Sequence, residues 1–95
     1  MNYSFSKTIR IQGKEYIVKA PSTTNHKKYD VFLDNKKILS FGDNRFEQFR
    51  DKLGFYKDKD HGDLKRKRAY RLRHQNDYID NPLYPGYWSF RFLWT

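Results

Sequence analysis

Residues Thr8 to Lys19 read TIRIQGKEYIVK. Apolar residues alternate with polar ones before Gly13, and after it Tyr16 and Val18 share one parity while Ile17 lies on the other. The alternating apolar positions are Ile9, Ile11, Tyr16 and Val18. Alternation with a period of two is typical of a strand that buries one face, and glycine is a residue type that tight turns favour. The stretch therefore predicts an N-terminal β-hairpin over about residues 8–19.

A second hairpin is expected after a polar connection. Residues 20–28 contain a polar cluster without periodicity, which is typical of a surface loop. Alternation resumes from Tyr29 to Leu33, and Asp34 to Lys36 supplies turn chemistry before the apolar stretch Ile38 to Phe41. We therefore predict a second hairpin over about residues 29–41, and with it a small antiparallel sheet of three or four strands.

The next segment carries the signals of a short helix. Asn44 precedes Glu47 by three residues, as in a capping box, and Gly54 offers a natural stop. The apolar residues that would share one helical face are Phe46, Phe49 and Leu53. These signals predict a helix over about residues 45–53.

A strongly basic segment follows. Residues Leu64 to His74 read LKRKRAYRLRH, with six positive charges, no negative charge and no helix breaker. Asp60 or Asp63 could cap its first turn. We predict a helix over about residues 63–74, roughly 16 Å long. It should lie on the surface because few of its residues are apolar, with Leu64, Tyr70 and their neighbours touching the rest of the domain.

The cations of this basic helix are the candidate anion-binding residues. They are Lys65, Arg66, Lys67, Arg68, Arg71 and Arg73. A solvated helix usually intersperses acidic residues four positions away, and here none occurs between Leu64 and Asn76. An anionic partner is therefore expected, either the phosphates of DNA or RNA or an acidic protein surface.

Aromatic side chains gather at the C-terminal end, in residues 84–94. The interface or core candidates are Tyr87, Trp88, Phe90, Phe92 and Trp94. Their spacing favours a short helix, although alternation also fits a strand. We expect these rings to be buried in a core or an interface more than to stack on bases.

Composition limits the fold and the chemistry. A chain of 95 residues with eight Phe, eight Tyr and two Trp predicts one small α+β domain, in which a sheet of hairpins is followed by two short helices and the aromatic C-terminal segment. Since cysteine is absent, neither disulfides nor thiolate zinc sites can form, and we expect no metal and no cofactor. No secretory signal and no membrane-spanning run is found, so we expect a protein that is not secreted and has no membrane partner.

A metal-dependent nuclease is a remote alternative. Asp60, His61, Asp63, His74 and Asp77 gather titratable groups around the basic helix. On a continuous helix, however, the two histidines would be roughly 20 Å apart, too far to share one ion. Helix capping by the acids explains them better, so we predict no catalytic residue and no enzyme.

Several short motifs between Lys27 and Trp94 resemble a small family of uncharacterised proteins of large DNA viruses and some tailed phages. The matching elements are Lys27-Lys28-Tyr29-Asp30-Val31, Phe41-Gly42-Asp43, Asp60-His61, Lys65-Arg66-Lys67, Tyr70-Arg71-Leu72-Arg73-His74, Gly86-Tyr87-Trp88-Ser89 and Leu93-Trp94. The resemblance implies a viral origin and carries no established activity. The hairpin over residues 8–19 lies outside it.

These observations favour a non-enzymatic small basic viral protein, a minor virion or capsid-associated structural component. Its net charge of +9 suits partners such as nucleic acid or acidic surfaces of capsid and other virion proteins. It is expected in the virion, or otherwise in the host cytoplasm or nucleus. The alternative is a nucleic-acid-binding accessory protein in viral replication or transcription.

Overall fold

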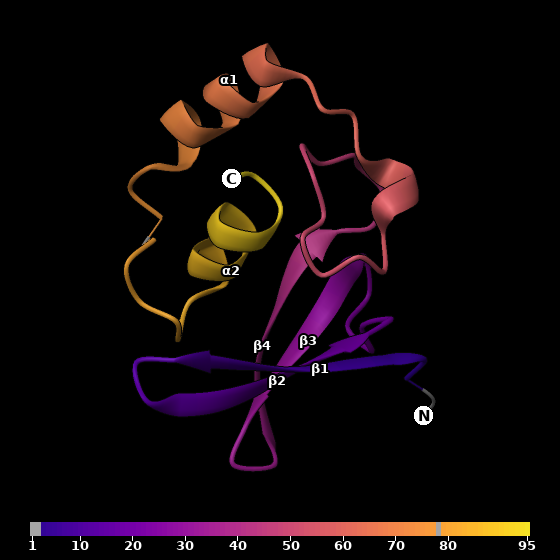
Figure 1. Ribbon diagram of the computed structural model, residues 1–95, viewed down its shortest axis with the longest axis vertical. Coiled ribbons are helices and arrows are strands. Elements are labelled where there is room, and N and C mark those ends of the chain that lie inside the picture. The colour runs from indigo at the N-terminus through magenta and orange to yellow at the C-terminus, as the bar shows by residue number, and fades with distance from the viewer. Residues whose placement is uncertain (1–2, 78) are drawn as a thin grey trace. The chain divides into compact units, whose positions relative to one another are not determined.

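A computed structural model describes residues 3–77 and 79–95. The fold is α+β, as predicted, with a four-stranded antiparallel sheet followed by two helices (Figure 1). The chain forms two compact units, residues 1–44 and residues 45–95, and each is described by itself. The organisation as one domain stays a prediction.

The first unit contains the sheet, a simple meander in the order β1-β2-β3-β4. The strands are β1 (Phe5–Ile11), β2 (Lys14–Ala20), β3 (Lys27–Leu33) and β4 (Lys36–Asp43). Both predicted hairpins are confirmed, and their strands run a few residues beyond the predicted ends. The predicted loop over residues 20–28 is shorter, because Ala20, Lys27 and Lys28 pair within strands.

Two tight turns set the register of the hairpins. Gln12 and Gly13 have φ of 53° and 79°, and Asp34 and Asn35 have φ of 52° and 65°. Two consecutive residues with positive φ match the right-handed twist of the flanking strands, and Gly, Asn and Asp adopt this conformation most readily. The turn chemistry thus explains why β1 pairs with β2 and why β3 pairs with β4.

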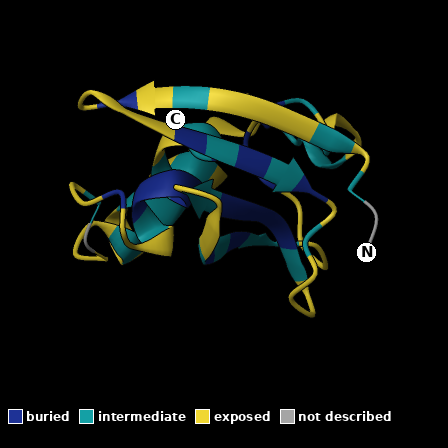
Figure 2. Cartoon of the chain, turned by 90° about the horizontal axis from the view of Figure 1, so that it is seen from below, coloured by how far each residue is buried: buried dark blue, intermediate teal, exposed yellow. Residues whose placement is uncertain are grey.

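One face of the sheet is buried, and its rings pack on one another. Tyr29 and Phe41 are cross-strand partners, both fully buried, and their rings stack with centroids 5.2 Å apart. Val18 and Val31 pair beside them. Figure 2 shows this alternation in β2, whereas the edge strand β1 is largely exposed. Aromatic and β-branched residues thus supply the core of the sheet, as composition indicated.

Asp30 organises the opposite face of the sheet. Its carboxylate is fully buried and accepts hydrogen bonds from Ser22 Oγ, Ser40 Oγ, Tyr3 Oη and the backbone N–H of Thr23. Ser22 and Thr23 belong to the polar connection between β2 and β3, so this connection is tied down by one carboxylate from the strand that follows it.

The same hydrogen bonds control the charge of Asp30. Burial alone would raise its pKa, but the bonds from Ser22, Ser40, Thr23 and Tyr3 outweigh burial and hold the pKa of the carboxyl well below its ordinary value of 3.8. A pKa that is lower in the folded than in the unfolded state adds stability above pH 3.8, and this stability is lost as the pH falls below that value.

The second unit begins with irregular structure, and the predicted helix over residues 45–53 is wrong. Of its proposed cap, Asn44 lies in a turn and Glu47 directly precedes an isolated bridge between Gln48 and Asp60. The backbone N–H groups of Arg50 and Lys52 donate to carbonyls of the C-terminal segment, at Leu93 and Phe92. Backbone N–H groups that donate to a distant segment are not available for the hydrogen bonds of a helix.

Two acidic side chains complete this irregular arrangement. The Asp51 carboxylate accepts the N–H groups of Leu53 and Tyr56, and the Asp60 carboxylate accepts the N–H of Asp51. Side-chain oxygens of this kind compete with helical hydrogen bonds. The apolar stripe is only partly buried, because Phe49 and Leu53 are buried while Phe46 is 63% exposed.

Two helices follow, connected to the irregular segment by a single 3-10 turn, η1 (Lys57–Lys59). The basic helix is confirmed as α1 (Leu64–His74), and its cap is Asp63, whose carboxylate accepts the N–H groups of Lys65 and Arg66. The aromatic terminus contains α2 (Pro85–Phe92), with proline in the first helical position. The helical alternative for this segment is therefore correct, and the strand is not.

Gly86 lets the start of α2 approach the turn that follows α1. A Cβ atom at this position would lie 2.2 Å from the backbone oxygen of Asp77. Only glycine allows so close an approach between two backbones. The indole N–H of Trp88, two residues further along, donates to the carbonyl of Pro82 at 2.8 Å and holds the connection that leads into α2.

We expect the Asp30→Asn substitution to lower the free energy of unfolding by about 3 kcal/mol, because the amide loses the negative charge and places an N–H donor against hydroxyl donors. Chemical denaturation followed by far-ultraviolet circular dichroism measures the change. Asp34→Asn is the matched control, since Asp34 is exposed in a turn that Asn also favours, and less than about 0.5 kcal/mol is expected there. Equal losses in the two variants would contradict the role assigned to Asp30.

Candidate anion-binding surface

All six cations predicted as anion ligands lie on α1, and no residue of this helix is buried. With about 100° between successive residues, they divide into two groups. We call the first group, whose members lie within about 100° of one another around the helix axis, the outer face. It comprises Lys65, Arg66 and Arg73. The remaining cations, Lys67, Arg68 and Arg71, line a groove.

Three of the six cations, Arg66, Lys67 and Arg71, have partners within the second unit. Arg66 forms an exposed ion pair with Glu47 at 3.0 Å. The ammonium of Lys67 lies 4.6 Å from the centroid of the Phe49 ring, within the range of a cation–π contact. These contacts hold the side chains near the helix without neutralising Lys67.

Arg71 is the most constrained of these cations. Its guanidinium lies 4.1 Å from the centroid of the Phe90 ring and donates to the carbonyl of Trp94 at 3.1 Å. Both contacts leave the positive charge without an acidic partner among the described residues. The charge is thus oriented by the fold and remains available to an external anion.

The other three cations, Lys65, Arg68 and Arg73, are exposed. Within residues 3–77 and 79–95, no hydrogen bond or ion pair engages their side chains. The surface of α1 therefore presents an excess of positive charge that the described part of the chain does not compensate.

Ring stacking positions α1. The Tyr70 ring lies against Trp94, with centroids 4.1 Å apart and an angle of 6° between the planes, and its other neighbour is His74 at 4.2 Å. Trp94 is also in contact with His61, at 5.3 Å. Burial raises the pKa of the Tyr70 hydroxyl, as expected for a phenol in this position. Sequence reasoning predicted that Tyr70 touches the fold but did not identify Trp94 as its partner.

A groove runs along one side of α1. Its volume is about 520 Å³, and its lining residues are Leu64, Lys67, Arg68, Arg71, Leu72, Gln75, Ile79 and Phe90. Leu64 was expected to touch the rest of the fold, but it is 64% exposed, and Leu72 is 62% exposed. The groove was not predicted, because its apolar side chains come from three separate segments of the chain.

The predicted aromatic residues differ in their environments. Tyr87 and Trp88 are buried on α2, whereas Phe90, Phe92 and Trp94 are only partly buried. Trp88 stacks on Phe92 with centroids 5.4 Å apart. Of the five, Phe90 lies in the groove and Trp94 anchors α1, so the aromatic terminus supports the basic surface.

The titratable residues around α1 have local partners. Nδ1 of His61 accepts the backbone N–H of Asp63 at 2.9 Å, and Nδ1 of His74 lies 2.6 Å from a carboxylate oxygen of Asp77. Asp60 accepts hydrogen bonds from the Gln48 side chain and the backbone at Asp51. No group of three potential metal ligands is found among the residues that the structure describes.

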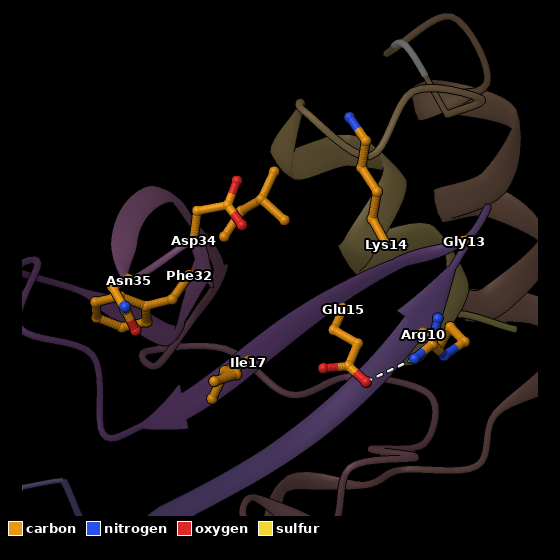
Figure 3. A pocket seen from close by; sticks show the side chains of 9 residues that line it. Arg10, Gly13, Lys14, Glu15, Ile17, Phe32, Asp34 and Asn35 are labelled. Atoms are coloured by element: carbon orange, nitrogen blue, oxygen red, sulfur yellow. Dashed lines mark hydrogen bonds and ion pairs between the residues drawn. The ribbon is translucent and has the colours of Figure 1, made fainter.

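The sheet of the first unit carries another depression, of about 580 Å³, between the turns of the two hairpins (Figure 3). Ile17 and Phe32, which are cross-strand partners, lie beneath it, and Lys14 and Asp34 lie at its ends. Arg10 there pairs with Glu15 at 2.6 Å. Because its charges of both signs balance, this depression lacks the one-sided charge of α1.

Comparisons with protein-family models, with curated proteins and with solved structures found no match to this chain. Within the described residues, neither helix has the length and apolar character that crossing a bilayer requires. The functional argument therefore depends on the residues of α1 and their surroundings.

The environment of His61 predicts a pH dependence of stability. Burial and the nearby Arg66 charge outweigh three acids and lower the pKa of His61 below 6.5. The folded state thus binds the proton less tightly than the unfolded state, so stability is lost as the pH falls through 6.5 toward the lower folded-state pKa.

We expect His61→Asn to reduce this pH dependence, because the amide does not titrate. The measurement is the difference in unfolding free energy between neutral pH and about one unit below the ordinary histidine pKa. His26→Asn, at an exposed turn position where Asn is also suited to the positive φ, is the control and should keep the dependence of the unmodified protein. If His61→Asn kept the pH dependence of the unmodified protein, the lowered pKa of His61 would not be its cause.

Proposed function

We propose that this protein is a non-enzymatic nucleic-acid-binding protein, which contacts the phosphate backbone through the outer face of α1. The observation that carries the proposal is the uncompensated positive charge of this helix. Lys65 and Arg73 have no ion-pair partner among the described residues, and Arg66 is exposed beside a single carboxylate.

The charge pattern of α1 opposes folding, which supports a function in binding. Lys65 and Arg68 are i,i+3 neighbours, and Lys67 and Arg71 are i,i+4 neighbours. Each such like-charge pair destabilises a helix by about 0.2–0.5 kcal/mol. Four cations also occupy the N-terminal half, where the helix dipole favours negative charge. A binding role accounts for a pattern that stability alone disfavours.

The chemistry of the outer face suits phosphate contact without base readout. Lysine and arginine neutralise phosphates, and contacts to the backbone position a protein without specifying sequence. Lys65 and Arg73 are eight residues apart, which corresponds to about 12 Å along the helix axis. A rigid cationic rod of this length can follow several successive phosphates of one strand.

The setting that we propose is the virus particle. This proposal depends on the resemblance that the short motifs between Lys27 and Trp94 suggest, to proteins of large DNA viruses and tailed phages, and its form is a minor virion component beside the capsid proteins. A replication or transcription accessory protein would use the same cationic face. Mass spectrometry of purified particles of the encoding virus discriminates between them: presence at reproducible copy number is expected, and absence would favour the accessory role.

Binding is tested with the variant Lys65→Gln/Arg66→Gln/Arg73→Gln. Fluorescence anisotropy with short labelled single- and double-stranded DNA is measured over a salt series. For duplex DNA, the slope of log affinity against log salt should become shallower by about 0.9 for each phosphate contact that is lost. Glutamine keeps the helix, because its helix propensity is close to that of lysine and arginine.

The matched control removes the same charge elsewhere. Lys7→Gln/Lys14→Gln/Lys36→Gln changes three exposed lysines of the sheet and leaves α1 intact. This control should keep a slope close to that of the unmodified protein. Equal flattening in both variants would show that net charge alone binds DNA, and weak binding that neither variant changes would refute the proposed function.

A further inference from the structure

We propose that the groove beside α1 binds an acidic amphipathic helix of a partner protein. This site is separate from the outer face, because its cations are Lys67, Arg68 and Arg71. One helix would thereby present nucleic-acid contacts on one side and a protein-binding groove on the other. The inference goes beyond the proposed function and does not depend on it.

The apolar side of the groove is unusually exposed. Leu64 and Leu72 are 64% and 62% exposed although both line the same depression. They are eight residues apart, so their side chains recur on one face about 12 Å apart. Ile79 and Phe90 extend this apolar strip beyond the helix. Burying such side chains under a partner would contribute favourably to binding.

The cationic side of the groove is organised before any partner arrives. Arg71 is held by the Phe90 ring at 4.1 Å and by the carbonyl of Trp94, and Lys67 is held over Phe49. Arg68, between the two leucines in sequence, has no ion-pair partner among the described residues. None of the described lining residues is acidic. An occupant therefore needs Asp or Glu beside its apolar residues.

The lining favours a peptide over a nucleic acid. In protein grooves that bind single-stranded nucleic acids, the bases stack on the free faces of aromatic side chains. Among the described lining residues, three apolar ones are aliphatic and only Phe90 carries a ring, over which the guanidinium of Arg71 already lies. Aliphatic side chains pack well against the leucine-type residues of an amphipathic helix, as in other helix-in-groove complexes.

The volume and the shape agree with such an occupant. A groove of about 520 Å³ can take several side chains of a peptide. A partner helix with apolar residues at i, i+4 and i+7 carries an apolar stripe about 10 Å long, which is comparable to the distance of about 12 Å between Leu64 and Leu72 along α1. Glutamate or aspartate at its flanks would then reach the cations of the groove.

The test uses a labelled synthetic peptide with leucines at i, i+4 and i+7 and glutamates on its other faces. Two reference peptides are a scrambled sequence of the same composition and an oligoglutamate of the same charge. The protein variants are Leu64→Gln/Leu72→Gln and Arg68→Gln. Leu83→Gln is the matched control, because Leu83 is 55% exposed and lies outside the groove.

The amphipathic peptide should bind the unmodified protein at least tenfold more tightly than either reference peptide. The double leucine variant and Arg68→Gln should each weaken its binding about tenfold. Leu83→Gln and the outer-face variant should change it less than twofold. Circular dichroism establishes that each variant keeps the fold, which is expected because the changed side chains are exposed.

Three results would overturn the inference. Equal binding of the scrambled peptide or the oligoglutamate would show attraction by charge alone. Unchanged peptide binding by the double leucine variant would place the contact elsewhere. Loss of DNA binding by the double leucine variant, with the outer-face variant unaffected, would assign the groove to nucleic acid. Failure of the outer-face DNA experiment by itself would refute only the proposed function.

Discussion

The stacking of Tyr70 on Trp94 supports the whole basic surface. α1 has eleven residues, none of them buried, and its charges repel one another, so a helix of this sequence would be marginal in isolation. The parallel rings at 4.1 Å, together with the hydrogen bond from Arg71 to the Trp94 carbonyl, attach it to the C-terminal segment. Without this attachment, α1 would be mostly unfolded and its cations would no longer be held in one arrangement.

Aromatic rings have two roles in this protein. In the sheet, Tyr29 and Phe41 stack on each other within a core that also contains Val18 and Val31. Around α1, Phe49 and Phe90 lie beneath Lys67 and Arg71 and orient them without cancelling their charge. A ring stabilises a cation through its quadrupole and is not itself charged. The protein can therefore hold these basic groups in place while their positive charge still attracts an anionic partner.

The local signals of the sequence were reliable where neighbouring residues determine structure. The alternation and turn residues of both hairpins, the cap at Asp63 and the unbroken basic run all predicted elements that the structure contains. The helix expected over residues 45–53 failed because Arg50 and Lys52 donate to carbonyls at least forty residues away in the chain. A pairing over that separation leaves no local pattern.

The sequence alone determined the excess of positive charge, its concentration on one helix and the antiparallel sheet, because charge is a property of composition and hairpins depend on adjacent residues. Only the tertiary structure decided which cations are held and which are free, and it alone created the groove. The groove brings together Leu64, Ile79 and Phe90, which are far apart in the sequence, and separation along the chain does not reveal which residues are close in space.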